Sequence, residues 1–161
     1  MLWGKRKMIR DDELKRLEAY AKALGISIVR KRSTSKSPVA EWAMDGSEII
    51  LYDTHKYSKT QEIIILIHEL SHHKSHIARG RKEYIKTHQA YNADNEKDVP
   101  AKRHRKVIYE EELNDTQYWD TIIKDVNIKI NPIKIEIEKR FDIWSYKCYY
   151  RDWETDRKSV V

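Results

Sequence analysis

The segment His68-Glu69-Leu70-Ser71-His72 carries two histidines four residues apart, with a glutamate directly after the first. On a helix, residues four apart lie on one face, so both imidazoles can bind the same zinc ion. Zinc held in this way lowers the pKa of a bound water to about 7, and a neighbouring carboxylate can take its proton. We therefore predict that His68 and His72 are metal ligands and that Glu69 is the general base and acid.

A catalytic zinc site takes a third protein ligand, for which the sequence offers several candidates. Glu111 shares an apolar helical face further along the chain, and we predict that it binds the metal. Asp115, one turn later, would then bond a ligand histidine. Because helix phase cannot be assigned to one residue from sequence, Glu110 and Glu112 remain alternatives, as does His88.

Two further histidines follow the motif. His76 continues the spacing of the first pair, but an unbroken helix places it about 12 Å along the axis from His68, too far for one tetrahedral ion. His73 points to another face. Peptide hydrolysis also needs a donor for the developing oxyanion. The side chains considered for that role are His76, Tyr84, His88 and Tyr109.

The motif lies in a segment with strong helix signals. Ser58 and Gln61 match a capping box, which predicts a helix beginning there and reaching at least Ser75. The apolar run Ile63–Ile67 would bury the first half of this helix and hold the ligands at its exposed end. Before it, two apolar runs flank Asp45-Gly46, a dipeptide typical of β-hairpin turns. These runs are residues 39–44 and 48–52.

Other elements are predicted on both sides. Asp11-Asp12 could cap a helix that ends at Gly25, with its apolar positions at Leu14, Leu17, Ala21 and Leu24. A short strand follows at residues 26–29, and part of residues 79–106 reads as a long surface loop. A later helix from about Lys106 has an inward stripe of Ile108, Glu111, Asp115, Trp119, Ile122 and Val126.

A last helix is predicted after Asn131-Pro132, which resembles a cap followed by proline at the first helical position. Its apolar residues at helical spacing are Ile133, Ile137, Phe141, Trp144 and Cys148. Cys148 is expected in the core, and the tryptophans in the core or at its edges. Alternation of isoleucines at residues 133–137 leaves a strand as the alternative.

These elements indicate an α+β fold with one domain over residues 1–155, and the motif His68–His72 predicts that it is a zincin-like metallopeptidase domain. Its core would span about residues 11–127, with a helical extension over about 131–150. We expect a short antiparallel sheet packed on the active-site helix and further helices. Residues 156–161 match the peptide that a common sequencing-adapter DNA sequence encodes in one reading frame, so we expect a non-native tail there.

Composition narrows the function classes. The chain has 32 Lys and Arg against 26 Asp and Glu, a net charge of +6 that is compatible with nucleic acid or an acidic partner. Aromatic residues do not alternate with the basic runs as a base-stacking surface requires. One cysteine excludes an internal disulfide and fits a reducing compartment. With no secretory signal and no long apolar run, we expect a cytoplasmic protein without a membrane segment.

The motif helix ending at His68–His73, the strand-rich segment before it and the later helix with Glu111 and Asp115 resemble the ImmA/IrrE family of zinc metallopeptidases. The resemblance covers about residues 26–126. It implies a gluzincin-like domain in which His68, His72 and a helix glutamate bind Zn²⁺ while Glu69 acts as base. It also implies a protein substrate, a repressor-like DNA-binding protein, in a phage or mobile-element context.

The chain departs from that family at Ser71, where glycine is usual, and at Asn114 and Tyr118, where small residues are usual. Two alternatives therefore stay open. The first is a SprT-like, DNA-associated zinc protease, which the segment His88-Gln89-Ala90-Tyr91 loosely imitates. The second is a non-catalytic, basic, zinc-containing binding module that contacts nucleic acid or a regulator. Glu69 favours catalysis, because a structural metal site has no use for a base there.

Overall fold

The structure is a computed structural model of the 161-residue chain. It describes residues 2–32, 39–43, 45–53, 57–80, 82–83, 86–87, 89 and 102–144. The chain forms two compact units. Unit 1 comprises residues 1–74 and 118–130, and unit 2 comprises residues 75–117 and 131–161.

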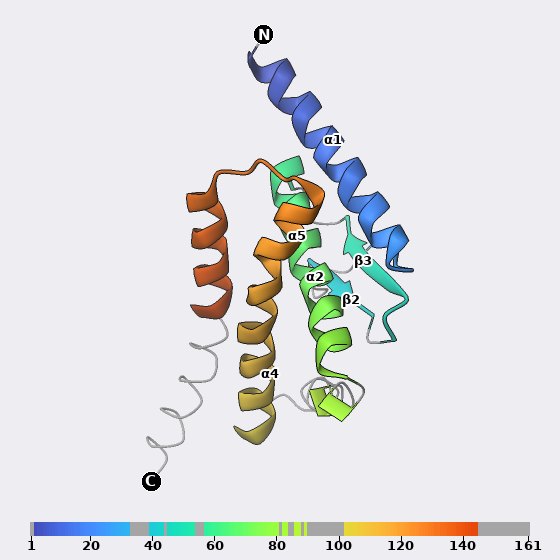
Figure 1. Cartoon of the computed structure of the whole chain (residues 1–161), viewed down its shortest axis with the longest axis vertical. Coiled ribbons are helices and arrows are strands. Elements are labelled where there is room, and N and C mark those ends of the chain that lie inside the picture. Colours follow the sequence, from blue (N-terminus) through green and yellow to red (C-terminus); the bar gives the residue numbers. More distant parts are fainter. Residues whose placement is uncertain are drawn as a thin grey trace. The chain divides into compact units, whose positions relative to one another are not determined.

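Unit 1 combines helices with a small mixed sheet (Figure 1). Its elements are α1 (Leu2–Ala23), β1 (Ser27–Lys31), β2 (Ala40–Trp42), β3 (Glu48–Tyr52), α2 (Lys59–Arg79) as far as Lys74, and α5 (Trp119–Val126). An α+β architecture is thus confirmed.

The sheet has the order β1-β3-β2. β2 pairs with β3 in the antiparallel sense, which confirms the predicted hairpin, and Gly46 in its turn has a φ of 77°. β1 pairs with β3 in the parallel sense, with Val29 opposite Ile50. The prediction of an antiparallel sheet was therefore wrong for β1, because this strand adds to the other edge of β3 instead of continuing the hairpin.

The hydrophobic core of unit 1 centres on β3. Ile49, Ile50 and Leu51 are all buried, as expected for a central strand covered on both faces. Helical side chains complete the core, namely Leu14, Leu17, Ala21, Ile63, Leu66, Ile67, Leu70, Trp119, Ile122 and Val126.

α1 begins at Leu2, well before the predicted start, so Asp11 and Asp12 lie inside the helix. The prediction failed because residues 5–10 are mostly good helix formers that let the helix continue upstream. Asp11 instead forms an ion pair with Lys59, at 2.7 Å. The predicted C-terminal end is confirmed by Gly25, which has a φ of 79°.

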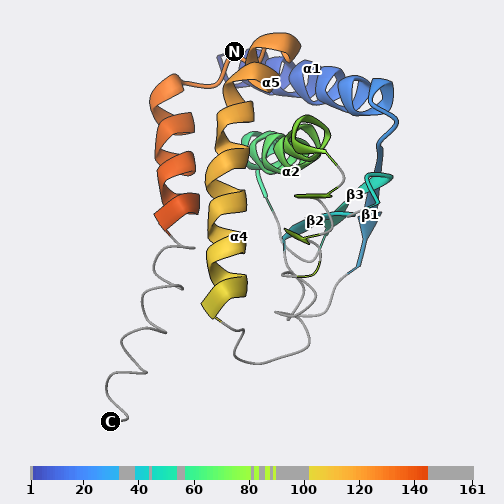
Figure 2. The same ribbon diagram turned by 60° about the horizontal axis from the view of Figure 1, so that its bottom comes forward.

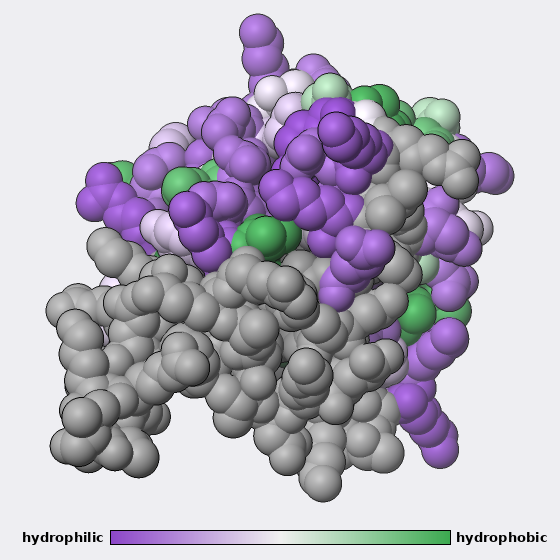
Figure 3. Space-filling model, turned by 90° about the horizontal axis from the view of Figure 1, so that it is seen from below, coloured by the Kyte–Doolittle hydropathy of each residue, from purple (hydrophilic) through white to green (hydrophobic). Residues whose placement is uncertain are grey.

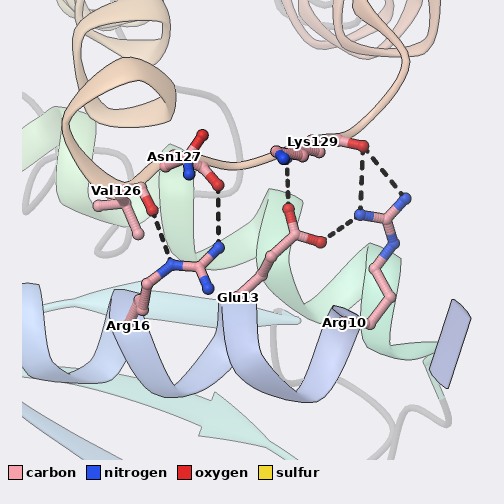
Figure 4. A network of polar contacts seen from close by, with 6 residues as sticks. All are labelled: Arg10, Glu13, Arg16, Val126, Asn127 and Lys129. Carbon is pink, nitrogen blue, oxygen red and sulfur yellow. Dashed lines mark hydrogen bonds and ion pairs between the residues drawn. The ribbon is translucent and has the colours of Figure 1, made fainter. Parts of the chain in front are cut away.

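Polar side chains of α1 bond the backbone at the end of α5 and just after it (Figure 4). Glu13 is fully buried; its carboxylate accepts a hydrogen bond from the backbone N–H of Lys129 and forms an ion pair with Arg10. Arg16 donates to the carbonyl oxygens of Val126 and Asn127, at 3.0 and 2.9 Å. The guanidinium thus satisfies carbonyls that a helix end leaves without intrahelical partners.

Unit 2 contains the last turn of α2, from Ser75, and α4 (Lys102–Asp115). A helical segment at residues 132–144 runs back alongside α4 in both ribbon views (Figures 1 and 2). Helical residues also occur at 82–83, 86–87 and 89, within the segment where a surface loop was predicted. Residues 90–101 lie outside the described part.

The single helix predicted from about Lys106 is interrupted. α4 ends at Asp115, a 3-10 turn η1 (Thr116–Tyr118) follows, and α5 begins at Trp119. The predicted inward stripe is nevertheless confirmed, because all six of its residues are buried. They are Ile108, Glu111, Asp115, Trp119, Ile122 and Val126.

The segment 132–144 is helical, so the strand alternative was wrong. Asn131 caps it as predicted, since its side-chain oxygen accepts a hydrogen bond from the N–H of Ile133 at 2.9 Å. Its apolar stripe, however, is exposed, and Trp144 at 58% exposure is not a core residue. The spacing shows which residues share a face, but it does not show where that face points. Cys148, Trp153 and the tail at 156–161 lie outside the described residues.

Much of the described surface is polar. The face shown in Figure 3 is mostly hydrophilic outside the grey region, in keeping with a mean hydropathy of −0.83. Among the residues that the structure describes, no helix combines the length and apolar character needed to cross a membrane.

Candidate metal centre

The predicted capping box positions the start of the motif helix. Ser58 N–H donates to the side-chain oxygen of Gln61 at 2.9 Å, and Gln61 N–H donates to Ser58 Oγ at 3.2 Å. Downstream, Ile63, Leu66 and Ile67 are fully buried. The first half of α2 is therefore anchored in the core of unit 1, as predicted.

His68 and His72 are brought together on α2. Their Nε2 atoms lie 3.1 Å apart, and their rings meet edge to face with centroids 4.7 Å apart. Two nitrogens that bind one tetrahedral zinc at about 2.0–2.1 Å lie about 3.3 Å from each other. The observed separation is close to this value, so the pair fits a shared zinc ion with little rearrangement.

Tryptophans from two other elements pack on the two rings. Trp42 of β2 stacks on His72, with centroids 6.4 Å apart and planes 18° apart. Trp119 of α5 meets His68 edge to face at 5.9 Å. Ser71 Oγ donates to the backbone carbonyl of His68 at 2.5 Å. The two tryptophan contacts restrict both rings, which favours a preorganised pair.

The motif is more enclosed than predicted. Glu69 is 7% exposed and His72 is 9% exposed, whereas an exposed helix end was expected. The prediction failed because no local signal in the sequence indicates that Trp42 and Trp119 pack against His72 and His68. Glu69, the residue directly after His68, is thus a buried carboxylate, and a carboxylate shielded from bulk water can serve in proton transfer.

His73 faces the hairpin turn. A Cβ built on Gly46 would lie 3.5 Å from ring atoms of His73, and Trp42 meets this ring edge to face at 6.0 Å. Within the described residues, neither ring nitrogen has a hydrogen-bond partner. Burial, followed by the positive charge of Lys74, lowers the pKa of His73. The ring is therefore held neutral by the fold.

Glu111 of α4 has its described partners within unit 2. Its Oε2 forms an ion pair with Arg79 and accepts a hydrogen bond from Thr87 Oγ1 at 3.3 Å. Its Oε1 lies 3.6 Å from His76 Nε2. The carboxylate is 1% exposed, so the guanidinium balances its charge in a dry environment. Sequence reasoning missed Arg79, whose only signal was its place one turn after His76, and Thr87, which gave none.

The other acids near Glu111 differ in burial. Glu112 and Asp115 are 1% and 0% exposed. Glu110 is a surface residue that pairs with Lys106 at 3.8 Å, which disfavours it as a ligand. Buried side chains that could hold a metal ion therefore occur in both units: His72 in unit 1, and Glu111, Glu112 and Asp115 in unit 2.

Not all of the predicted candidates can be located. His88 and Tyr84 lie outside the described residues, whereas Tyr109 is half-buried on α4 and His76 is buried in the last turn of α2. The roles of these residues as oxyanion donors remain predictions.

Comparisons with protein-family models, with curated proteins and with solved structures found no match to this chain. The functional inference therefore rests on the chain's own residues.

Proposed function

We propose that this protein is a zinc-dependent metalloendopeptidase. The observation that carries the proposal is the 3.1 Å separation of the His68 and His72 Nε2 atoms, with the buried Glu69 between the two histidines in sequence. Nitrogen ligands at this spacing suit zinc, and a structural zinc site would gain nothing from a carboxylate at this position.

Bound zinc would supply a Lewis acid that polarises the scissile carbonyl and makes a water molecule acidic near neutral pH. The chain's own contribution begins with Glu69, which accepts the proton of the attacking water and delivers it to the leaving amine. Trp42 and Trp119 keep His68 and His72 in place. Burial of Glu69 limits competition from bulk water for its proton.

For the third ligand we retain Glu111. Two donors, Arg79 and Thr87, hold its Oε2, and carboxylate ligands of zinc are commonly oriented by such hydrogen bonds. Glu112 on the same helix is the alternative, because it is equally buried. A donor set of two imidazoles and one carboxylate fits catalytic zinc.

We propose a protein substrate, specifically a repressor-like DNA-binding protein in a phage or mobile-element context, and activity in the cytoplasm. This assignment depends on the resemblance of the motif order to the ImmA/IrrE family. A small peptidase of this kind need not act on generic substrates, so metal binding is the first property to measure.

The direct test is elemental analysis of the purified full chain after zinc loading and removal of excess metal. We expect about one zinc per chain in the wild type, and its loss in His72→Ala. Glu111→Gln and Glu112→Gln form a matched pair of adjacent, equally buried positions, and the variant that loses zinc identifies the ligand. A wild-type chain that retains no zinc would exclude a zinc enzyme.

Catalysis is tested separately with a proteome-derived peptide library and mass spectrometry. The wild type should produce cleavages that are absent with Glu69→Gln, although both proteins hold zinc equally. Equal cleavage by Glu69→Gln would refute the assigned base.

The two alternatives give different results. Zinc retained in both glutamine variants but lost in His88→Ala would favour the SprT-like reading. A basic zinc-containing binding module would bind nucleic acid with an affinity that falls as salt rises, and Glu69→Gln would leave that binding unchanged.

A further inference from the structure

The helical segment 132–144 of unit 2 turns its apolar face to solvent. Four large side chains along it are exposed: Ile133 at 69%, Ile137 at 60%, Phe141 at 63% and Trp144 at 58%. Steps of four, four and three residues place them on one stripe. We call this set the apolar stripe.

The opposite face of the same segment is the buried one. Ile135 is 4% exposed, and the side chain of Lys139 is 12% exposed. This helix therefore buries Ile135 and most of the aliphatic part of Lys139, while it exposes two isoleucines and two aromatic side chains. Contiguous exposed apolar surface of this kind marks an interaction site. Phe141 and Trp144 already contact each other, with centroids 6.1 Å apart.

We propose that the apolar stripe binds the same stripe of a second copy of this chain, with the two helices antiparallel about a two-fold axis. In this arrangement Ile133 faces the partner's Trp144, and Ile137 faces the partner's Phe141. A large residue thus meets a smaller one at each level, which lets the two stripes interdigitate.

The charges beside the stripe favour this occupant and this direction. Glu136 and Arg140 flank the stripe on the same side, one turn apart. In the antiparallel dimer the two-fold axis is perpendicular to both helices, so the side of one helix that carries Glu136 and Arg140 lies next to the same side of the partner helix. Glu136 of each copy therefore approaches Arg140 of the other. The surface is therefore self-complementary, with two reciprocal ion pairs. A parallel two-fold pairing would instead place this side against the opposite flank of the partner helix, so these two reciprocal ion pairs would not form.

The size of the stripe predicts a weak dimer. A fully covered aromatic side chain buries about 150–250 Å², so four large residues supply roughly half of the ~800 Å² per partner of a standard interface. We expect a dissociation constant on the order of 10–100 µM. The partners would exchange readily at low concentration.

The test is sedimentation equilibrium of the full chain at low salt, from about 5 to about 500 µM. Wild type should dimerise, and Phe141→Glu should remain monomeric while keeping the wild-type circular dichroism spectrum. Met8→Gln is the control, because Met8 is an equally exposed apolar residue (69%) on α1. It should dimerise like the wild type.

Charge exchange tests the antiparallel pairing. Glu136→Arg and Arg140→Glu should each weaken self-association by about tenfold, because like charges then meet. An equal mixture of the two variants should regain wild-type association, since each Arg now meets a Glu in the heterodimer. A wild type that stays monomeric at the highest concentration would overturn the proposal. A mixture that associates no better than the single variants would also overturn it.

Discussion

Arg79, in the last turn of α2, forms an ion pair with the buried carboxylate of Glu111 on α4. The guanidinium side chain is 23% exposed, whereas the carboxylate is 1% exposed. The acid therefore depends on this arginine for its charge balance far more than the arginine depends on the acid. This asymmetry determines what each substitution should do.

Arg79→Met should destabilise the metal-free protein by about 1–3 kcal/mol, because Glu111 would remain buried without its cation and the arginine is partly solvated. Urea unfolding in the presence of a chelator measures this change. Lys106→Met is the matched control, since it breaks the exposed pair with Glu110 and should cost less than about 0.5 kcal/mol. Equal losses of stability in the two variants would show that the buried ion pair contributes no more to stability than the exposed one.

Zinc should stabilise the fold through the histidine pair. A ligand that binds only the native state at a hundredfold excess over its dissociation constant adds about 2.7 kcal/mol. Thermal unfolding with zinc and with a chelator should therefore differ for the wild type and for Glu69→Gln. The difference should vanish for His72→Ala. A zinc effect that persists in His72→Ala would mean that the ion binds elsewhere.

Glu13→Ala should destabilise unit 1 by about 2–4 kcal/mol, because the N–H of Lys129 loses a buried acceptor and Arg10 loses its ion-pair partner. Chemical unfolding measures the loss. Asp12→Asn, at the exposed neighbouring position, should change stability by less than about 0.5 kcal/mol. If both variants had the same free energy of unfolding, the bonds drawn in Figure 4 would contribute nothing to stability.

The lowered pKa of His73 predicts how stability depends on pH. The unfolded chain takes up a proton at the ordinary value of about 6.5, whereas the folded chain resists protonation. As far as this ring is concerned, the free energy of unfolding is therefore highest above about pH 6.5 and decreases as the pH falls through the lowered pKa. His73→Leu lacks this loss.

His73→Leu should consequently gain stability relative to the wild type as the pH falls from about 7 to about 5. Parallel urea unfolding of both proteins with a chelator checks this. At about pH 8 the variant should already be more stable by about 1 kcal/mol, because two buried ring nitrogens without partners are removed. A stability difference that does not change with pH would contradict the shift.

Local signals allowed much of the candidate site to be predicted. The capping box of Ser58 and Gln61 involves residues three apart, and the histidine pair needs only helical periodicity. The turn at Asp45-Gly46 depends on a backbone preference of two residues. Each of these features is determined within a few positions, so one sequence contains the necessary information.

Features that depend on distant partners could not be predicted in the same way. The parallel pairing of β1 with β3 depends on which edge of the hairpin β1 joins, and the residues of β1 alone do not determine that edge. The packing of Trp42 against His72 joins a strand to a helix, and the partners of Glu111 come from two other segments. The break at Thr116–Tyr118 interrupts a periodicity that the sequence continues without a gap.

The bonds between α1 and the backbone after α5 join residues more than a hundred positions apart, as in the pair of Glu13 and Lys129, separated by 116. Closing so long a loop costs chain entropy before these contacts repay it, and contacts of high sequence separation slow folding. Unit 1 is also built from two stretches of chain, with all of unit 2's first stretch synthesised between them. During synthesis, α1 must therefore wait for residue 129 before Glu13 acquires its backbone donor, so the completion of unit 1 is a late event in folding.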